Sequence, residues 1–189
     1  MTLPNLLTLL RIAAIPLIVA GTVIPGSLVG LDLRGWATAL FMAAAITDWL
    51  DGFLARQLGQ GSALGRVMDP IADKVLVASI LVALTATGEL AGWAVVATLV
   101  IIARELLISG LREALAGHTI ALPVTFLAKV KTTVQLIALV FLLAAPLAGA
   151  PVREIGLAAL WLAAALALIT GVQYIALGLR HLGAAGAGE

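Results

Sequence analysis

Three long stretches of this 189-residue chain contain no Asp, Glu, Lys or Arg, namely residues 12–31, 132–152 and 155–179. A helix of about 20 apolar residues is long enough to cross the hydrocarbon core of a bilayer. Hydrophobic residues make up 62% of the chain and charged residues only 11%, whereas a soluble domain carries about a quarter charged residues. We therefore expect an all-α, polytopic membrane protein.

Three further apolar stretches are too short to cross, and each borders a charged residue. They are residues 35–47 before Asp48, residues 75–88 after Lys74, and residues 90–103 before Arg104. Fourteen helical residues cover only about 21 Å, so each helix must continue through its charged residues. We predict six transmembrane helices, the second to fourth at about 35–56, 68–88 and 91–114. Their charged ends meet in a polar cavity on one side of the membrane, and charges at such depth usually mark function.

The basic residues predict the orientation. All Lys and Arg residues except Arg34 and Arg153 fall on the side of the polar cavity, which places that cavity and both termini in the cytoplasm. No basic region precedes residues 12–31, so we expect a retained first span rather than a cleaved signal. Trp36 and Trp93 then fall at the opposite interface. We expect a single domain over residues 1–182 and a disordered Gly/Ala tail over residues 183–189.

The composition also excludes several classes of function. The chain has no cysteine, which removes disulfides, thiolate metal sites and cysteine nucleophiles. Its basic residues form no run and no stripe with aromatic residues, so we expect no nucleic-acid partner.

Four aspartates stand close together in the segment "DWLDGFLARQLGQGSALGRVMDPIADK" at residues 48–74. With 100° per residue, Asp48, Asp51, Gly52 and Ala55 share one stripe of a helix. Asp69 and Asp73, four residues apart, share a face of the next helix. The glycine-containing turn at residues 57–65 brings the two faces together, so all four carboxylates can converge.

Four neighbouring carboxylates do not stay ionised without cations, because like charges disfavour one another. Two divalent ions would neutralise them. The donors are all oxygen, which favours Mg²⁺ or Mn²⁺ over zinc, and magnesium commonly bridges carboxylates and substrate phosphates. Two other interpretations remain open at this point. The aspartates could pair with Arg56, Arg66 and Lys74 in a structural network, or they could line a divalent-cation transporter.

The spacing of these residues resembles a known signature. Asp48-x-x-Asp51-Gly52-x-x-Ala55-Arg56, eight residues, then Gly65-x-x-x-Asp69-x-x-x-Asp73 is similar to that of the CDP-alcohol phosphatidyltransferases, membrane enzymes of phospholipid synthesis. Outside it, "NLLTLLRIAAIP" near the start, "IIARELLISGLRE" at 101–113 and "KVKTTVQ" at 129–135 resemble a bacterial branch of that family, whose acceptor is glycerol 3-phosphate. The resemblance covers most of the chain.

The resemblance implies a function. Family members displace CMP from CDP-diacylglycerol with an alcohol hydroxyl, hold two divalent metals in a cytosol-facing cavity, have six transmembrane helices and usually form homodimers. A protein of this branch would reside in the bacterial inner membrane. Carried over by position, the metal ligands would be Asp48, Asp51, Asp69 and Asp73, and Asp73 would also be the general base. The residues expected to border the CDP group are Asp48, Gly52, Ala55, Arg56, Gly65 and Asp69.

The remaining basic residues bear on the acceptor. Arg104, Arg112, Lys129 and Lys131 add positive charge to the cavity, which favours an anionic acceptor such as glycerol 3-phosphate. Alternatively, the lysines anchor the chain at lipid headgroups, and Arg104 pairs with Glu105 or Glu113. Acceptors elsewhere in the family would be inositol phosphate, serine or phosphatidylglycerol.

Thr8 and Arg11 belong to the resembled N-terminal stretch. We expect them to orient the first helix or to contact substrate, and we assign neither a catalytic role.

Overall fold

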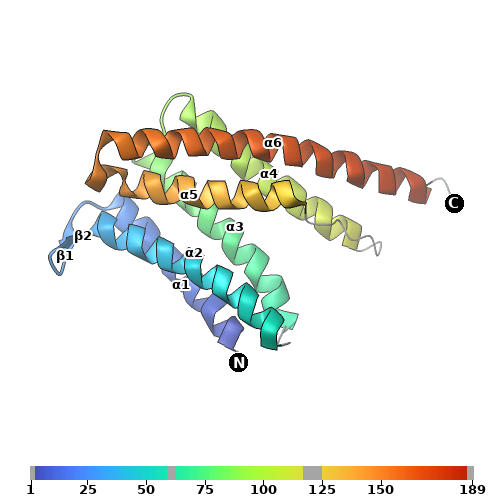
Figure 1. Cartoon of the computed structure of the whole chain (residues 1–189), viewed down its shortest axis with the longest axis horizontal. Helices are drawn as coiled ribbons and strands as arrows, with labels where there is room; N and C mark the ends of the chain where they lie inside the picture. Colours follow the sequence, from blue (N-terminus) through green and yellow to red (C-terminus); the bar gives the residue numbers. More distant parts are fainter. Residues whose placement is uncertain (1–2, 59–62, 117–124, 187–189) are drawn as a thin grey trace. The chain divides into compact units, whose positions relative to one another are not determined.

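The computed structural model describes residues 3–58, 63–116 and 125–186, which are almost entirely helical (Figure 1). The helices there are α1 (Leu3–Val23), α2 (Leu33–Leu58), α3 (Ala63–Ala86), α4 (Ala94–Ala116), α5 (Phe126–Ala148) and α6 (Ala150–Gly186). A small antiparallel hairpin, β1 (Ser27–Leu28) and β2 (Leu31–Asp32), joins α1 to α2. Apart from this hairpin, the all-α prediction is confirmed.

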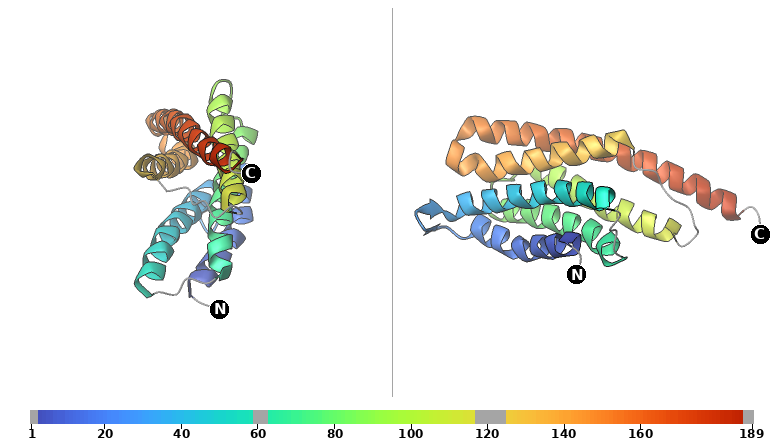
Figure 2. Two further views of the ribbon diagram at one scale, coloured as in Figure 1. Left: turned by 90° about the vertical axis from the view of Figure 1, so that its right-hand side faces the viewer. Right: turned by 60° about the horizontal axis from the view of Figure 1, so that its bottom comes forward.

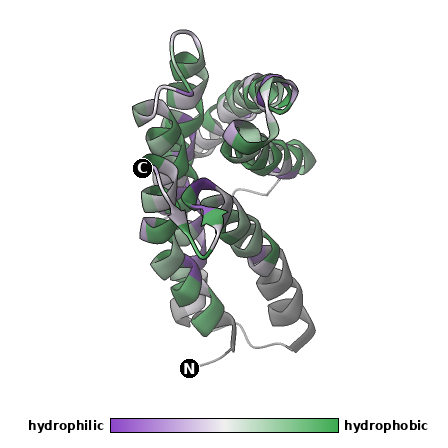
Figure 3. Cartoon of the chain, turned by 90° about the vertical axis from the view of Figure 1, so that its left-hand side faces the viewer, coloured by the Kyte–Doolittle hydropathy of each residue, from purple (hydrophilic) through white to green (hydrophobic). Residues whose placement is uncertain are grey.

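Four of the described helices are long and apolar enough to cross a membrane. These spans are Leu6–Val23, Ala94–Leu115, Phe126–Ala148 and Ala150–Leu179. Hydrophobic residues extend along the described helices, and hydrophilic residues are confined to few places (Figure 3). The chain is therefore a polytopic membrane protein. The described parts of α2 and α3, which contain the signature aspartates, are not among these four spans.

The first helix differs from the predicted span of residues 12–31. It begins at Leu3 and ends at Val23, so it includes Arg11 and stops before the end of the charge-free stretch. The chain turns back at the hairpin, where Val29 and Gly30 have φ of 53° and 75° and the N–H of Leu33 donates to the carbonyl of Gly26 at 2.9 Å. Two loop residues with positive φ are typical of the tight turn of a hairpin.

The bounds of α5 and α6 can be compared with the charge-free stretches. Lys129 and Lys131 are expected to begin the fifth span, whose charge-free part is residues 132–152, and α5 contains both lysines but begins three residues earlier than Lys129, at Phe126. α6 continues through Gly186, into the tail predicted to be disordered, and residues 187–189 lie outside the described residues.

The helices group into two compact units. Unit 1 comprises residues 1–91 and 139–156, and unit 2 comprises residues 92–138 and 157–189. The signature aspartates belong to unit 1, and the basic residues predicted to bind the acceptor belong to unit 2.

In unit 1, α1 packs against both α2 and α3 (Figure 2). Apolar side chains from all three helices fill this core, among them the fully buried Ile18, Phe41 and Ile80. Gly21 permits the close approach of α1 to α2, because a Cβ atom there would lie 2.7 Å from the carbonyl oxygen of Leu33. This packing fixes the helices that carry the aspartates.

A hydrogen-bonding cluster around Arg34 ties together the start of α2 and its neighbours in unit 1. The guanidinium group donates to the carbonyl oxygens of Thr22 at 2.8 Å and Leu143 at 3.0 Å, and it forms an ion pair with Glu89. The Asp32 side chain accepts the backbone N–H of Arg34 at 2.7 Å and so caps the helix. Arg34 thus joins the end of α1, the segment after α3 and the end of α5.

Candidate functional site

The carboxylates of Asp48 and Asp73 meet at one guanidinium group. Nη1 of Arg11, from α1, lies 2.6 Å from Oδ1 of Asp48 and 3.0 Å from Oδ1 of Asp73. One turn before Arg11, the hydroxyl of Thr8 donates to the carboxylate of Asp69. The structure therefore gathers three of the four predicted metal ligands, one from α2 and two from α3, around one face of α1.

Burial distinguishes the cation from the carboxylates at this cluster. Arg11 is only 2% exposed, whereas the side chains of Asp48 and Asp73 are 37% and 48% exposed. A buried guanidinium group needs carboxylate partners to offset its desolvation, and Arg11 has them. The aspartates keep part of their surface open to a ligand.

Several predicted site residues can be placed only by their backbone. α2 runs through Asp51, Gly52, Ala55 and Arg56, whose side chains lie outside the described part of the structure. Gly65 lies buried in the first turn of α3. Residues 59–62, within the predicted turn between the two acidic faces, are outside the described residues.

The oxygen donors fit a hard divalent cation. Among the described side chains, no three acidic or histidine residues form a ready metal-binding group. Asp51, on the stripe of Asp48, is not among the side chains described. The carboxylates of Asp48 and Asp73 converge on one guanidinium nitrogen, so two oxygen donors of the kind that Mg²⁺ and Mn²⁺ bind lie close together.

In unit 2, Glu105 neutralises part of the predicted acceptor cluster. Its carboxylate binds Lys131, which is fully buried, and accepts from Nη1 of Arg104 at 3.2 Å. Nη2 of Arg104 also donates to the hydroxyl of Thr170 on α6 at 3.2 Å. The alternative pairing of Arg104 with Glu105 is thus present, while Lys129 is exposed at the start of α5.

Arg112 lies in a different environment from Arg104. Its Nη2 atom donates to the hydroxyl of Tyr174 on α6 at 3.3 Å, and its guanidinium carbon lies 5.2 Å from the centre of that ring. Arg104 approaches the same ring at 5.7 Å.

Sequence reasoning missed both Tyr174 and Thr170. The available signal was their spacing of four residues, which puts two polar side chains on one face of a largely apolar helix.

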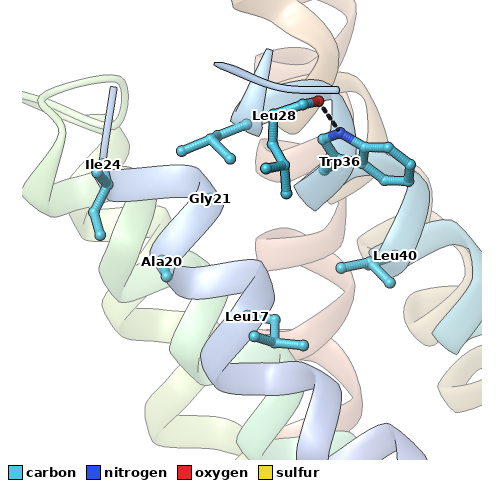
Figure 4. A pocket seen from close by; sticks show the side chains of 8 residues that line it. Leu17, Ala20, Gly21, Ile24, Leu28, Trp36 and Leu40 are labelled. Atoms are coloured by element: carbon cyan, nitrogen blue, oxygen red, sulfur yellow. Dashed lines mark hydrogen bonds between the residues drawn. The ribbon is translucent and has the colours of Figure 1, made fainter. Parts of the chain in front are cut away.

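Two cavities in the described part of the chain are lined mainly by apolar side chains. One of about 290 Å³ lies where α1, the hairpin and the start of α2 meet in unit 1, and its lining includes Leu17, Gly21 and Trp36 (Figure 4). The indole N–H of Trp36 donates to the Leu28 carbonyl at 2.9 Å. Another, of about 150 Å³, lies between α4 and α6 in unit 2, where Arg104 is the one charged lining residue.

The sequence as a whole is similar to a family of known enzymes. The family model described as CDP-alcohol phosphatidyltransferase matches residues 1–171. A protein of Pectobacterium atrosepticum is 42% identical over 179 residues, which is 92% of this chain and 92% of that protein. Proteins of Escherichia coli strain K12 and Rickettsia felis are each 40% identical, over 92% and 91% of this chain and 92% of their own lengths. All three are named CDP-diacylglycerol–glycerol-3-phosphate 3-phosphatidyltransferase.

Proposed function

The chain belongs to the CDP-alcohol phosphatidyltransferase family, and from this membership we propose that it is a phosphatidylglycerophosphate synthase. It would transfer the phosphatidyl group of CDP-diacylglycerol to glycerol 3-phosphate, giving phosphatidylglycerophosphate and CMP. The observation that carries this proposal is the identity of 40% or more, over nine tenths of both chains, to proteins named for that transfer.

The proposed reaction is a substitution at phosphorus. A hydroxyl oxygen of glycerol 3-phosphate forms a bond to the phosphorus that carries diacylglycerol, while the bond from that phosphorus to the bridging oxygen breaks. CMP leaves with the electron pair, and the hydroxyl proton passes to the carboxylate of Asp73. Such reactions depend on positioning and charge stabilisation more than on covalent catalysis by the protein.

Asp48, Asp51, Asp69 and Asp73 would hold two Mg²⁺ or Mn²⁺ ions. When bound, these ions would stabilise negative charge on the pyrophosphate and the leaving CMP. The contacts of α1 support this assignment, because Arg11 holds Asp48 and Asp73 together and Thr8 orients Asp69. Thr8 and Arg11 thus act as positioning residues for the carboxylates.

The nucleotide would lie against the small residues of the signature. Gly52 and Ala55 share the helical stripe of Asp48 and offer little side-chain bulk, and Gly65 lies in the first turn of the next acidic helix, α3. Arg56, at the edge of the stripe, would contact the phosphates, and Asp48 and Asp69 would border the CDP group.

The acceptor phosphate would bind to the basic residues of unit 2. Arg104 and Lys131 share one acid, Glu105, so that pair of cations keeps an excess of positive charge. Arg112 and the exposed Lys129 add to it. A phosphate monoester matches this excess better than an uncharged alcohol does.

The membrane arrangement belongs to the same proposal. Six helices would cross the bacterial inner membrane, with the aspartates and both termini on the cytoplasmic side, because that side carries nearly all Lys and Arg residues. The diacylglycerol chains would remain in lipid while the nucleotide and the acceptor enter from water. The protein would work as a homodimer, as the family does.

An acceptor panel tests this function. The purified protein is reconstituted in lipid nanodiscs and incubated with CDP-diacylglycerol and one acceptor at a time. The acceptors are glycerol 3-phosphate, inositol phosphate, serine and phosphatidylglycerol, and the release of CMP is measured. Of the four acceptors, we expect only glycerol 3-phosphate to cause CMP release. Chelation of metal with EDTA should abolish this release, and added Mg²⁺ or Mn²⁺ should restore it. Faster release with another alcohol would assign a different acceptor. Uptake of Mn²⁺ into sealed vesicles without any CMP release would instead identify a transporter.

A further inference from the structure

Tyr174 occupies a central place in unit 2. It is the chain's single tyrosine, it is 1% exposed, and it lies on the largely apolar helix α6. Its hydroxyl accepts from Nη2 of Arg112 at 3.3 Å and from the backbone N–H of Thr125 at 3.1 Å. Its ring faces the guanidinium groups of both Arg112 and Arg104. One side chain thus contacts two of the four residues proposed to bind the acceptor phosphate.

Arg112 differs from its neighbours because no carboxylate of the described residues pairs with it. Arg104 and Lys131 both bind Glu105, whereas the partners of Arg112 within the described residues are the ring and hydroxyl of Tyr174. Its Nε atom is buried and makes no hydrogen bond within the same residues. Arg112 is partly buried, and a partly buried guanidinium group without a counter-charge is costly, so an anionic ligand would reduce that cost.

The contacts of Tyr174 also restrain the position of the Arg112 guanidinium group. Thr125 immediately precedes α5, and its hydroxyl accepts the N–H of Ala128 at 3.2 Å, as the capping residue of a helix does. Tyr174 therefore connects the side chain of Arg112 on α4 to the start of α5. Cation–π contact with the ring restrains the guanidinium group further.

We propose that Tyr174 is a positioning residue of the acceptor-phosphate site. Its hydroxyl and ring would fix the guanidinium group of Arg112 in the orientation that binds the phosphate monoester of glycerol 3-phosphate. The inference rests on the proposed function. It assigns to Arg112 the direct contact with the phosphate, and to Glu105 the partial neutralisation of Arg104 and Lys131.

The test is the kinetic effect of Tyr174→Phe, which keeps the ring but removes the hydroxyl. We expect the KM for glycerol 3-phosphate to rise about tenfold, which corresponds to the loss of one hydrogen bond to a charged group. The KM for CDP-diacylglycerol and kcat should stay within twofold of wild type. Thr98→Val is the matched control. Thr98 is a buried hydroxyl on α4 that bonds to the Ala94 carbonyl of its own helix, and both KM values should be unchanged.

A second variant tests the same mechanism without altering the tyrosine. Arg112→Lys keeps the charge but loses the guanidinium geometry, and it should raise the KM for glycerol 3-phosphate selectively. In the Arg112→Lys background, adding Tyr174→Phe should change the KM for glycerol 3-phosphate by less than twofold. The effects of two substitutions are not additive when one residue acts through the other.

Three results would overturn the inference: no change in KM with either variant, equal changes in the KM of both substrates, or fully additive effects. Wild-type protein that releases no CMP with glycerol 3-phosphate would instead overturn the proposed function itself.

Discussion

Arg11 organises the acidic cluster although it belongs to no part of the aspartate signature. It stands 37 positions before Asp48 in the sequence, and no spacing rule connects the two residues. Only the packing of α1 against α2 and α3 brings its guanidinium group to both Asp48 and Asp73. The convergence of Asp48 with Asp73 could be predicted from helical spacing, but the cation between them could not.

Replacing Arg11 should therefore damage activity. Arg11→Met keeps the length of the side chain but leaves Asp48 and Asp73 without their common partner. We expect kcat/KM for CMP release to fall on the order of 100-fold, because small displacements of catalytic groups have effects of that size. Arg11→Lys retains the charge and should lose less. Wild-type rates in Arg11→Met would show that the cluster does not depend on this residue.

Asp73 should be the most sensitive of the aspartates in the chemical step. Asp73→Asn keeps the shape of the side chain but cannot accept the hydroxyl proton, and general bases typically contribute about 10²–10⁴-fold. We expect CMP release to fall by at least that factor at saturating substrate. Circular dichroism and thermal melting should show a folded protein. Substantial turnover in this variant would remove Asp73 from the role of base.

The helix boundaries could be predicted only in part from the charge-free stretches. A charge-free stretch marks where a helix can cross lipid, but a helix also continues through charges that find partners inside the protein. Arg11 within α1 is bound by aspartates, and Lys131 within α5 is bound by Glu105. Both helices therefore begin earlier than the charge-free stretches predict. Such pairings join distant segments and are not visible in local composition.

The hairpin between α1 and α2 contains a strained residue. Val29 is β-branched, has φ of 53°, and is 87% exposed. Left-handed backbone conformation costs an L-residue about 1–2 kcal/mol, whereas asparagine tolerates it. Val29→Asn should therefore raise the melting temperature in detergent without changing CMP release. Val29→Ala, which removes the branching but not the Cβ atom, should gain less. Equal gains for the two variants would argue against relief of strain in the turn.

At the scale of the whole molecule, we expect the melting temperature to depend strongly on the hydrogen-bonding cluster around Arg34 in unit 1. Its guanidinium group is largely buried and binds Glu89 and two carbonyl oxygens. Arg34→Met removes all three contacts and leaves Glu89 without its cationic partner, and breaking such a buried pair costs about 3 kcal/mol or more. We expect a lower melting temperature, with both KM values of the surviving protein unchanged.

Arg153 offers a matched control near the same glutamate. Its side chain is 45% exposed, and it makes longer contacts, 3.5 Å to Glu154 and 3.4 Å to the Glu89 carbonyl. Exposed pairs of this kind contribute only about 0–1 kcal/mol, so Arg153→Met should leave the melting temperature nearly unchanged. Equal losses for Arg34→Met and Arg153→Met would contradict the importance of burial in this cluster.

The aspartates of the signature and the basic acceptor residues lie in different compact units, and this separation has a consequence for protein engineering. Each group is fixed by contacts within its own unit: α1 holds the carboxylates, and Tyr174 with Glu105 holds the arginines and Lys131. On the proposed assignment of these residues, we expect that the choice of alcohol can be redesigned by exchanging a few side chains on α4, α5 and α6, while the aspartates proposed for cleavage of the nucleotide–lipid linkage are left intact.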